Sequence, residues 1–154
     1  KSLGLGDLLR GAVGLAGVAA SITGSIAGGL LVARLGLRRT LAPVAIAQSL
    51  AIVLYVALAL ARPGTAAVAA VAVIEQLAAG VGGSTFAIFL MRRCAPEHKA
   101  AHFAIASALI GVASTLAGYA SGALVARLGY ATFFALAFIA SLPGVALTWA
   151  VPKE

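Results

Sequence analysis

The sequence is short of charged residues, and above all of acidic ones. Of its 154 residues only 10% are charged, with 11 Lys and Arg against 4 Asp and Glu, whereas 62% are hydrophobic. A soluble domain carries roughly a quarter charged residues, so this polar complement cannot cover a surface that faces water. The composition therefore argues against a soluble enzyme or a nucleic-acid-binding domain, and its hydrophobicity argues against intrinsic disorder.

Cysteine and metal-ligating clusters are equally scarce. Cys94 is the one cysteine, so no internal disulfide can form. His98 and His102 come without further ligands, which is a weak basis for a metal site. The sequence also offers no nucleophile–base pair and no phosphate-binding loop. We therefore expect no enzymatic activity, no metal and no cofactor.

Long apolar runs fill most of the chain. Each run between basic residues is long enough to cross a bilayer as a helix, which takes about 20 residues. The runs are rich in Ala and Leu and do not alternate with polar residues, so helices are favoured over strands. The sequence thus predicts a single all-α domain over residues 1–154, a polytopic membrane bundle with five transmembrane helices. These are expected at about 8–34, 41–61, 65–91, 100–126 and 130–151.

The connections between the expected helices differ in their content of basic residues. The connections around 34–39 and 92–99 carry more of them than the connections on the other side. Cytoplasmic loops of membrane proteins are enriched in Lys and Arg, so we expect these two connections in the cytoplasm, the N-terminus outside and the C-terminus inside. The sequence begins with Lys1 rather than Met, and we expect it to be part of a longer protein.

An eight-residue segment occurs twice. Gly29–Gly36 reads GLLVARLG and Gly122–Gly129 reads GALVARLG, 93 residues further on. This offset carries the first expected helix onto the fourth and the second onto the fifth, which is the pattern of inverted three-helix repeats in secondary transporters. The alternative is coincidence in a biased composition. If the repeat is real, the helix at 65–91 should have its partner upstream of Lys1.

Glu75 is the carboxylate that lies within an expected span, near its middle. A charge at that depth costs about 2.5–3.5 kcal/mol, so Glu75 should face other helices or a water-filled cavity. A carboxyl group that changes charge there suits proton coupling, with Gln76 as a polar solute contact. The alternative is a protonated Glu that stabilises helix packing. Ser84 and Thr85 would either line the pathway or bond back to their own helix.

Small residues recur at helical spacing in two of the spans. Gly24 and Gly28 form one such pair, and Gly118 and Gly122 form another. Small residues let membrane helices approach closely. We expect helix contacts at both pairs, either as static packing or as interfaces along which helices slide.

The segment from Gly29 to Arg39 resembles the loop motif of the major facilitator superfamily, G-x-x-x-D-R-x-G-R-R-R. Five residues match it, while Ala33 stands in place of the Asp and Leu37 in place of an Arg. The resemblance implies a cytoplasmic gating loop, although the Asp that helps to latch the gate in this family is absent. The matching residues are Gly29, Arg34, Gly36, Arg38 and Arg39.

A second resemblance rests on Val73–Phe89, VIEQLAAGVGGSTFAIF, together with Phe103-Ala104, Ser107-Ala108 and Ala140–Gly144. These segments are similar to the C-terminal half of AmpG-type muropeptide permeases and of related acetyl-coenzyme A transporters. The resemblance implies helices eight to twelve of twelve, with 65–91 lining the central cavity. It also implies proton-coupled import of anhydro-muropeptides for cell-wall recycling, by alternating access across the bacterial inner membrane.

The expected partners follow from these two resemblances. They are a small-molecule solute and protons, the lipid bilayer, and the N-terminal half of the same transporter, but no nucleic acid. Two alternatives stay open. One is a major facilitator transporter for another solute, such as a drug, a sugar or an acyl-coenzyme A, and the other is a membrane scaffold that transports nothing.

Overall fold

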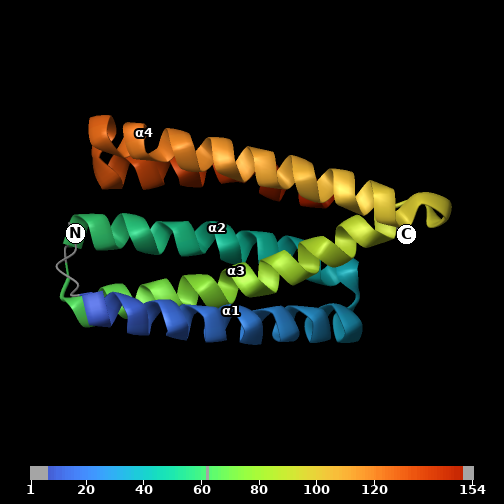
Figure 1. The fold of residues 1–154 in the computed structure, drawn as a ribbon, viewed down its shortest axis with the longest axis horizontal. Helices are drawn as coiled ribbons and strands as arrows, with labels where there is room; N and C mark the ends of the chain where they lie inside the picture. Colours follow the sequence, from blue (N-terminus) through green and yellow to red (C-terminus); the bar gives the residue numbers. More distant parts are fainter. Residues whose placement is uncertain (1–6, 62, 151–154) are drawn as a thin grey trace.

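The computed structural model describes residues 7–61 and 63–150, and Figure 1 shows them as a bundle of long helices. In chain order these are α1 (Asp7–Leu35), α2 (Leu37–Ala61), α3 (Thr65–Arg93), the short 3₁₀ helix η1 (Pro96–His98) and α4 (Lys99–Ala150). Within the described residues there is no strand, and four helices are long and apolar enough to cross a membrane. The expected helical membrane bundle is thus confirmed.

The helix α4 folds back on itself at Gly129. Its 52 residues would measure about 78 Å if straight, more than twice the roughly 30 Å of a bilayer core. Gly129 has φ 76° and ψ 163°, a left-handed φ that glycine adopts without steric penalty. The element therefore consists of two arms, 99–128 and 130–150, which run in opposite directions in Figure 1.

Gly36 makes the corresponding reversal between α1 and α2. It is the single residue between the two helices, and its φ is 81°. Gly36 and Gly129 occupy the same position in the repeated segment, and they are the glycines with positive φ among the residues described. The repeat seen in the sequence thus has a counterpart in the backbone, since both copies end in a glycine with a positive φ.

The short turn at Gly36 changes the expected boundary of the second helix. We expected it to begin near residue 41, after a basic loop, but α2 begins at Leu37. Arg38 and Arg39 therefore lie in the first turn of α2, and Arg34 lies in the last turn of α1. Because one glycine reverses the chain, both helices continue through the basic residues beyond the apolar runs.

The helices α1 and α3 approach each other closely along small residues. A Cβ built on Gly24 would collide with the backbone of Leu77, and one on Gly28 would collide with Ser84 and Val81. The hydroxyl of Ser25 donates a hydrogen bond to the carbonyl of Gly80, at 3.3 Å. Gly24 and Gly28 thus lie where α1 meets α3.

The first arm of α4, unlike α1 and α3, is not packed along another of the described helices at its glycines. All residues from 111 to 120 are exposed within this chain, and nothing lies within 4 Å of a Cβ built on Gly118 or Gly122. These two glycines make no helix contact within the described residues, in contrast to the expectation, because this arm lies on the outside of the bundle. The other helices pack more closely, α1 along α3, and α2 against both α3 and the second arm of α4.

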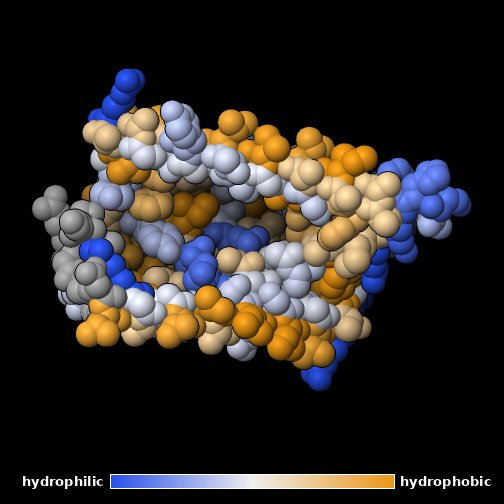
Figure 2. All heavy atoms as spheres, viewed as in Figure 1, coloured by the Kyte–Doolittle hydropathy of each residue, from blue (hydrophilic) through white to orange (hydrophobic). Residues whose placement is uncertain are grey.

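The surface of the bundle is apolar along its sides. Large hydrophobic side chains such as Leu15, Ile22 and Leu116 are exposed, and orange, hydrophobic atoms cover much of the outer face in Figure 2. The antiparallel order of the helices brings the basic residues around 34–39 and 92–99 to the same end. An apolar belt around long helices is the surface expected of a multi-pass membrane protein.

Candidate functional site

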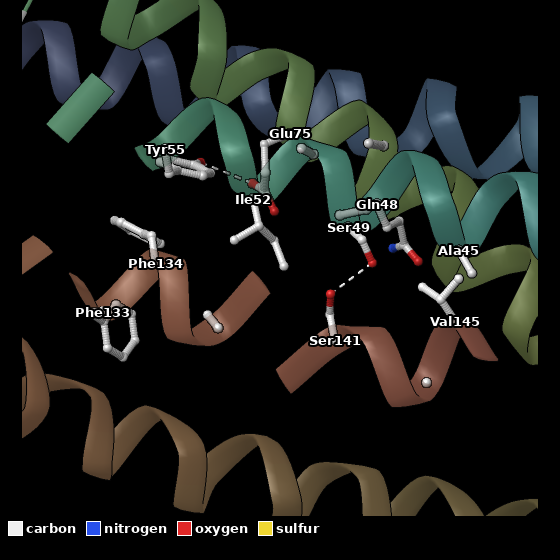
Figure 3. A pocket seen from close by; sticks show the side chains of 15 residues that line it. Ala45, Gln48, Ser49, Ile52, Tyr55, Glu75, Phe133, Phe134, Ser141 and Val145 are labelled. Atoms are coloured by element: carbon white, nitrogen blue, oxygen red, sulfur yellow. Dashed lines mark hydrogen bonds between the residues drawn. The ribbon is translucent and has the colours of Figure 1, made fainter. Parts of the chain in front are cut away.

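A cavity of about 520 Å³ lies between α2, α3 and the second arm of α4. Figure 2 shows a hollow in which blue, hydrophilic atoms are visible. Figure 3 shows the side chains that line it. Its polar and aromatic lining consists of Gln48, Ser49, Tyr55, Glu75, Phe133, Phe134 and Ser141.

Glu75 lines this cavity from α3 and is partly buried. The hydroxyl of Tyr55, on α2, donates a hydrogen bond to its Oε2 atom at 3.4 Å. Within the residues that the structure describes, no Lys, Arg or His forms an ion pair with Glu75. The carboxyl group is thus held by a neutral donor, and no basic side chain of the described residues balances its charge.

Aromatic rings form one end of the cavity. The ring of Tyr55 stacks on that of Phe134, with centroids 5.0 Å apart and an interplanar angle of 19°. Phe133 meets Phe134 edge to face, with centroids 5.3 Å apart. In Figure 3 the ring of Tyr55 lies beside Glu75, and Phe134 and Phe133 follow it along α4. Tyr55 therefore contacts both the carboxylate on α3 and the aromatic rings on α4.

Two serines join α2 to the second arm of α4 at the other end of the cavity. The Oγ atoms of Ser49 and Ser141 are 2.9 Å apart, and the Ser141 hydroxyl also lies 2.7 Å from the carbonyl of Phe138. A hydroxyl has one proton and a carbonyl can only accept. Ser141 therefore donates to Phe138 and accepts from Ser49, so both serine protons are used.

Gln48 lies next to this serine pair, at the edge between α2 and α3. Its amide occupies the space where Gly82 has no side chain, because a Cβ on Gly82 would collide with the amide carbon, nitrogen and oxygen. Figure 3 shows Gln48 beside Ser49 on α2. The absence of a side chain at Gly82 thus leaves room for this polar group.

The other residues expected at the pathway lie elsewhere. Gln76 faces α1, where its Cγ is 3.2 Å from a Cβ built on Gly17. Ser84 and Thr85 donate hydrogen bonds to the carbonyl of Val81 in their own helix, at 3.1 and 2.8 Å. Of the four polar residues expected at the solute site, the structure thus places Glu75 at the cavity and the other three away from it.

The residues of the loop motif lie at one end of the bundle, away from the cavity. Arg34, Arg38 and Arg39 are exposed there. The Thr40 side chain, which is almost fully buried, donates a hydrogen bond to the carbonyl of Gly36 at 2.7 Å. This bond ties the start of α2 to the turn.

Three cavity residues on α2 were missed in the sequence, although a signal for them exists. Gln48, Ser49 and Tyr55 interrupt an otherwise apolar run. Gln48 and Tyr55 are seven residues apart, which places them two turns apart on the same face of a helix. Polar residues on one face of a membrane helix indicate that this face is turned away from lipid.

No group of three or more His, Cys, Asp or Glu side chains that could hold a metal ion is found among the described residues. The chemistry that the cavity offers is therefore that of one carboxyl group, one amide, hydroxyl groups and aromatic rings. These groups can donate and accept hydrogen bonds and stack on rings, which is chemistry suited to a polar solute.

Comparison with known proteins shows that the chain is similar to permeases and transporters. The chain is 33% identical over 131 residues to the anhydromuropeptide permease of Escherichia coli K12, a match that covers 85% of this chain and 27% of that protein. It is 26% identical over 140 residues to a protein of Rickettsia felis named putative transporter AmpG 4, covering 91% of this chain and 34% of that protein. No family model matches the chain, and no solved structure matches it.

The matches extend over most of this chain but only part of the relatives. The chain spans about a quarter to a third of the length of the curated relatives that it matches. The chain is thus an apolar helical bundle whose sequence is similar to one segment of proteins named anhydromuropeptide permease and putative transporter AmpG 4.

Proposed function

We propose that this chain forms part of a permease of the major facilitator type that imports anhydro-muropeptides for cell-wall recycling, coupled to protons, across the bacterial inner membrane. The observation that carries the proposal is the place of Glu75, a carboxyl group within a membrane-spanning helix that lines a cavity and has no basic partner in the described residues. Intramembrane ionisable groups mark solute and proton pathways by default.

In this mechanism the cavity opens to the two sides of the membrane in turn. Glu75 takes up a proton when the cavity faces the outside and releases it when the cavity faces the cytoplasm. Neutralising the carboxyl group lowers the cost of closing the apolar helices around it. The Tyr55 hydroxyl keeps the carboxyl group directed toward the aromatic end of the cavity.

Transport in this proposal needs the rest of the transporter. The matched segment is 27% of the length of the E. coli permease, and two halves must move against each other for alternating access. The basic residues around 34–39 and 92–99 support a cytoplasmic position for that end of the bundle. The turn around Gly36, with its arginines, would then lie where the cytoplasmic gate closes, and the first segment would start outside.

The test is uptake by the full-length transporter in proteoliposomes. Wild-type protein should accumulate labelled anhydro-muropeptide when a pH gradient is imposed. Glu75→Gln keeps the size of the side chain but cannot exchange a proton, so it should lose gradient-driven accumulation while still exchanging solute across the membrane. Glu97→Gln is the matched control, because Glu97 is an exposed carboxylate in η1, outside the spans.

Each other outcome points to a different function. Unchanged accumulation in Glu75→Gln would remove Glu75 from the coupling mechanism. Competition by a drug, a sugar or an acyl-coenzyme A, but not by anhydro-muropeptide, would assign another solute to the cavity. A full-length protein that transports none of these solutes would favour the membrane scaffold.

A further inference from the structure

One polar group at the cavity has no partner in the structure. Gln48 lines the cavity from α2, and no hydrogen bond within residues 7–61 and 63–150 uses its amide. Gln48 is only partly buried, and no fully buried side-chain nitrogen or oxygen atom of the described residues lacks a hydrogen-bond partner, so its amide is not sealed inside the protein. Its oxygen and nitrogen are therefore available to a molecule that enters the cavity.

The other polar groups of the described lining are already engaged. The Tyr55 hydroxyl donates to Glu75, Ser141 donates to the carbonyl of Phe138, and Ser49 donates to Ser141. Glu75 accepts from Tyr55 and can carry charge. Gln48 thus stands apart as the neutral side chain that can both donate and accept toward a solute.

Two neighbouring glycines differ in their relation to this amide. Gly82 is buried, and a Cβ there would collide with all three atoms of the Gln48 amide group. Gly83 is exposed, and nothing lies within 4 Å of a Cβ built on it. The amide therefore keeps its place only while residue 82 has no side chain, whereas residue 83 has no influence on it.

We propose that Gln48 binds an amide group of the transported solute, and that Gly82 holds Gln48 in position to do so. This rests on the proposed function, since a muropeptide carries amide groups in its sugar acetamido substituents and in its peptide. A side-chain amide matches such a group in both directions, with N–H donating to its carbonyl and the oxygen accepting from its N–H.

The test measures solute binding by the full-length transporter. Gln48→Met keeps the length of the side chain but removes the amide, and it should raise the Kd and KM for anhydro-muropeptide roughly tenfold, with a smaller effect on maximal rate. Gly82→Ala should weaken binding in the same direction by displacing the amide. Gly83→Ala is the matched control and should leave Kd unchanged.

A double-mutant cycle separates this role from general damage to the helix. In the background of Gln48→Ala the amide is absent, so Gly82→Ala should have little further effect on Kd. If the effects of Gly82→Ala and Gln48→Ala simply multiply, Gly82 does not act through Gln48 and the proposal fails. The thermal stability of every variant, measured in detergent, shows whether that variant is folded. If Gln48→Met does not fold, Gly82→Ala still tests the site, because it leaves the Gln48 side chain intact.

The choice of solute identifies the source of the amide. If Gln48→Met weakens binding of a peptide-free disaccharide, Gln48 contacts an acetamido group, and if it weakens only the peptide-bearing solute, Gln48 contacts a peptide amide. Both results support the proposal. Unchanged Kd values for both solutes would overturn it, while a wild-type protein that binds neither solute would overturn the proposed function itself.

Discussion

Among single residues, Tyr55 links the carboxyl group of the cavity to its aromatic rings. Its hydroxyl donates to Glu75 and its ring stacks on Phe134. Tyr55→Phe removes the first contact and keeps the second. We expect it to reduce proton-coupled uptake roughly three- to tenfold, because a hydrogen bond to a charged group is lost, while the thermal stability of the protein stays close to wild type.

The comparison variant is Tyr55→Leu, which also removes the stacked ring. Aromatic pairs stabilise packing by about 0.5–1.5 kcal/mol beyond the buried area, so this variant should lower the melting temperature as well as the uptake. If Tyr55→Phe transports like wild type across the pH range, the hydroxyl does not position Glu75, and the contact between them is incidental.

The sequence predicted part of the site for a clear physical reason. A carboxylate inside an apolar span must be sheltered, so Glu75 was expected at a cavity or a helix contact, and the structure places it at a cavity. Gln76 is its neighbour in sequence, but consecutive helical residues point about 100° apart, and Gln76 faces α1 instead. Which helix covers which face depends on packing, which the sequence alone does not give.

At the scale of helices, the contact of α1 with α3 depends on small residues. A Cβ on Gly28 would collide with the backbone of Val81, so Gly28→Val should push the two helices apart. Overpacking of this kind destabilises a protein by roughly 1–3 kcal/mol. We expect a lower melting temperature of the full-length protein in detergent, measured by size-exclusion chromatography after heating.

Gly14→Val provides the control on the same helix. Nothing lies within 4 Å of a Cβ built on Gly14, so its added side chain should enter lipid and leave the melting temperature near wild type. Equal losses of stability in both variants would show that glycine is needed for the helix itself and not for the contact with α3.

The boundaries of the helices could be predicted only in part from the sequence. Apolar runs give the helices because the bilayer requires them, but the runs do not say how the chain turns between them. Gly36 and Gly129 supply these turns through a left-handed φ, and the helices consequently continue through Arg34 and Arg38. The repeated segment was visible in the sequence, while its role as a pair of equivalent turns needed the backbone.

For the whole molecule, the distribution of basic residues sets its orientation in the proposed membrane. The fold brings the basic segments around 34–39 and 92–99 to one end of the bundle, and the start of α3 lies at the opposite end. Because Lys and Arg are retained on the cytoplasmic side, the first end should face the cytoplasm and Thr65 the periplasm.

Single cysteines in a full-length protein without its native cysteines test this orientation. Thr65 and Glu97 are both exposed, so each accepts a cysteine with little change to packing. A membrane-impermeant maleimide added to intact spheroplasts should label Thr65→Cys but not Glu97→Cys, which should react only after lysis. The reverse pattern would place the arginine-rich turn outside, and the cytoplasmic gate could not then be formed by Arg34, Arg38 and Arg39.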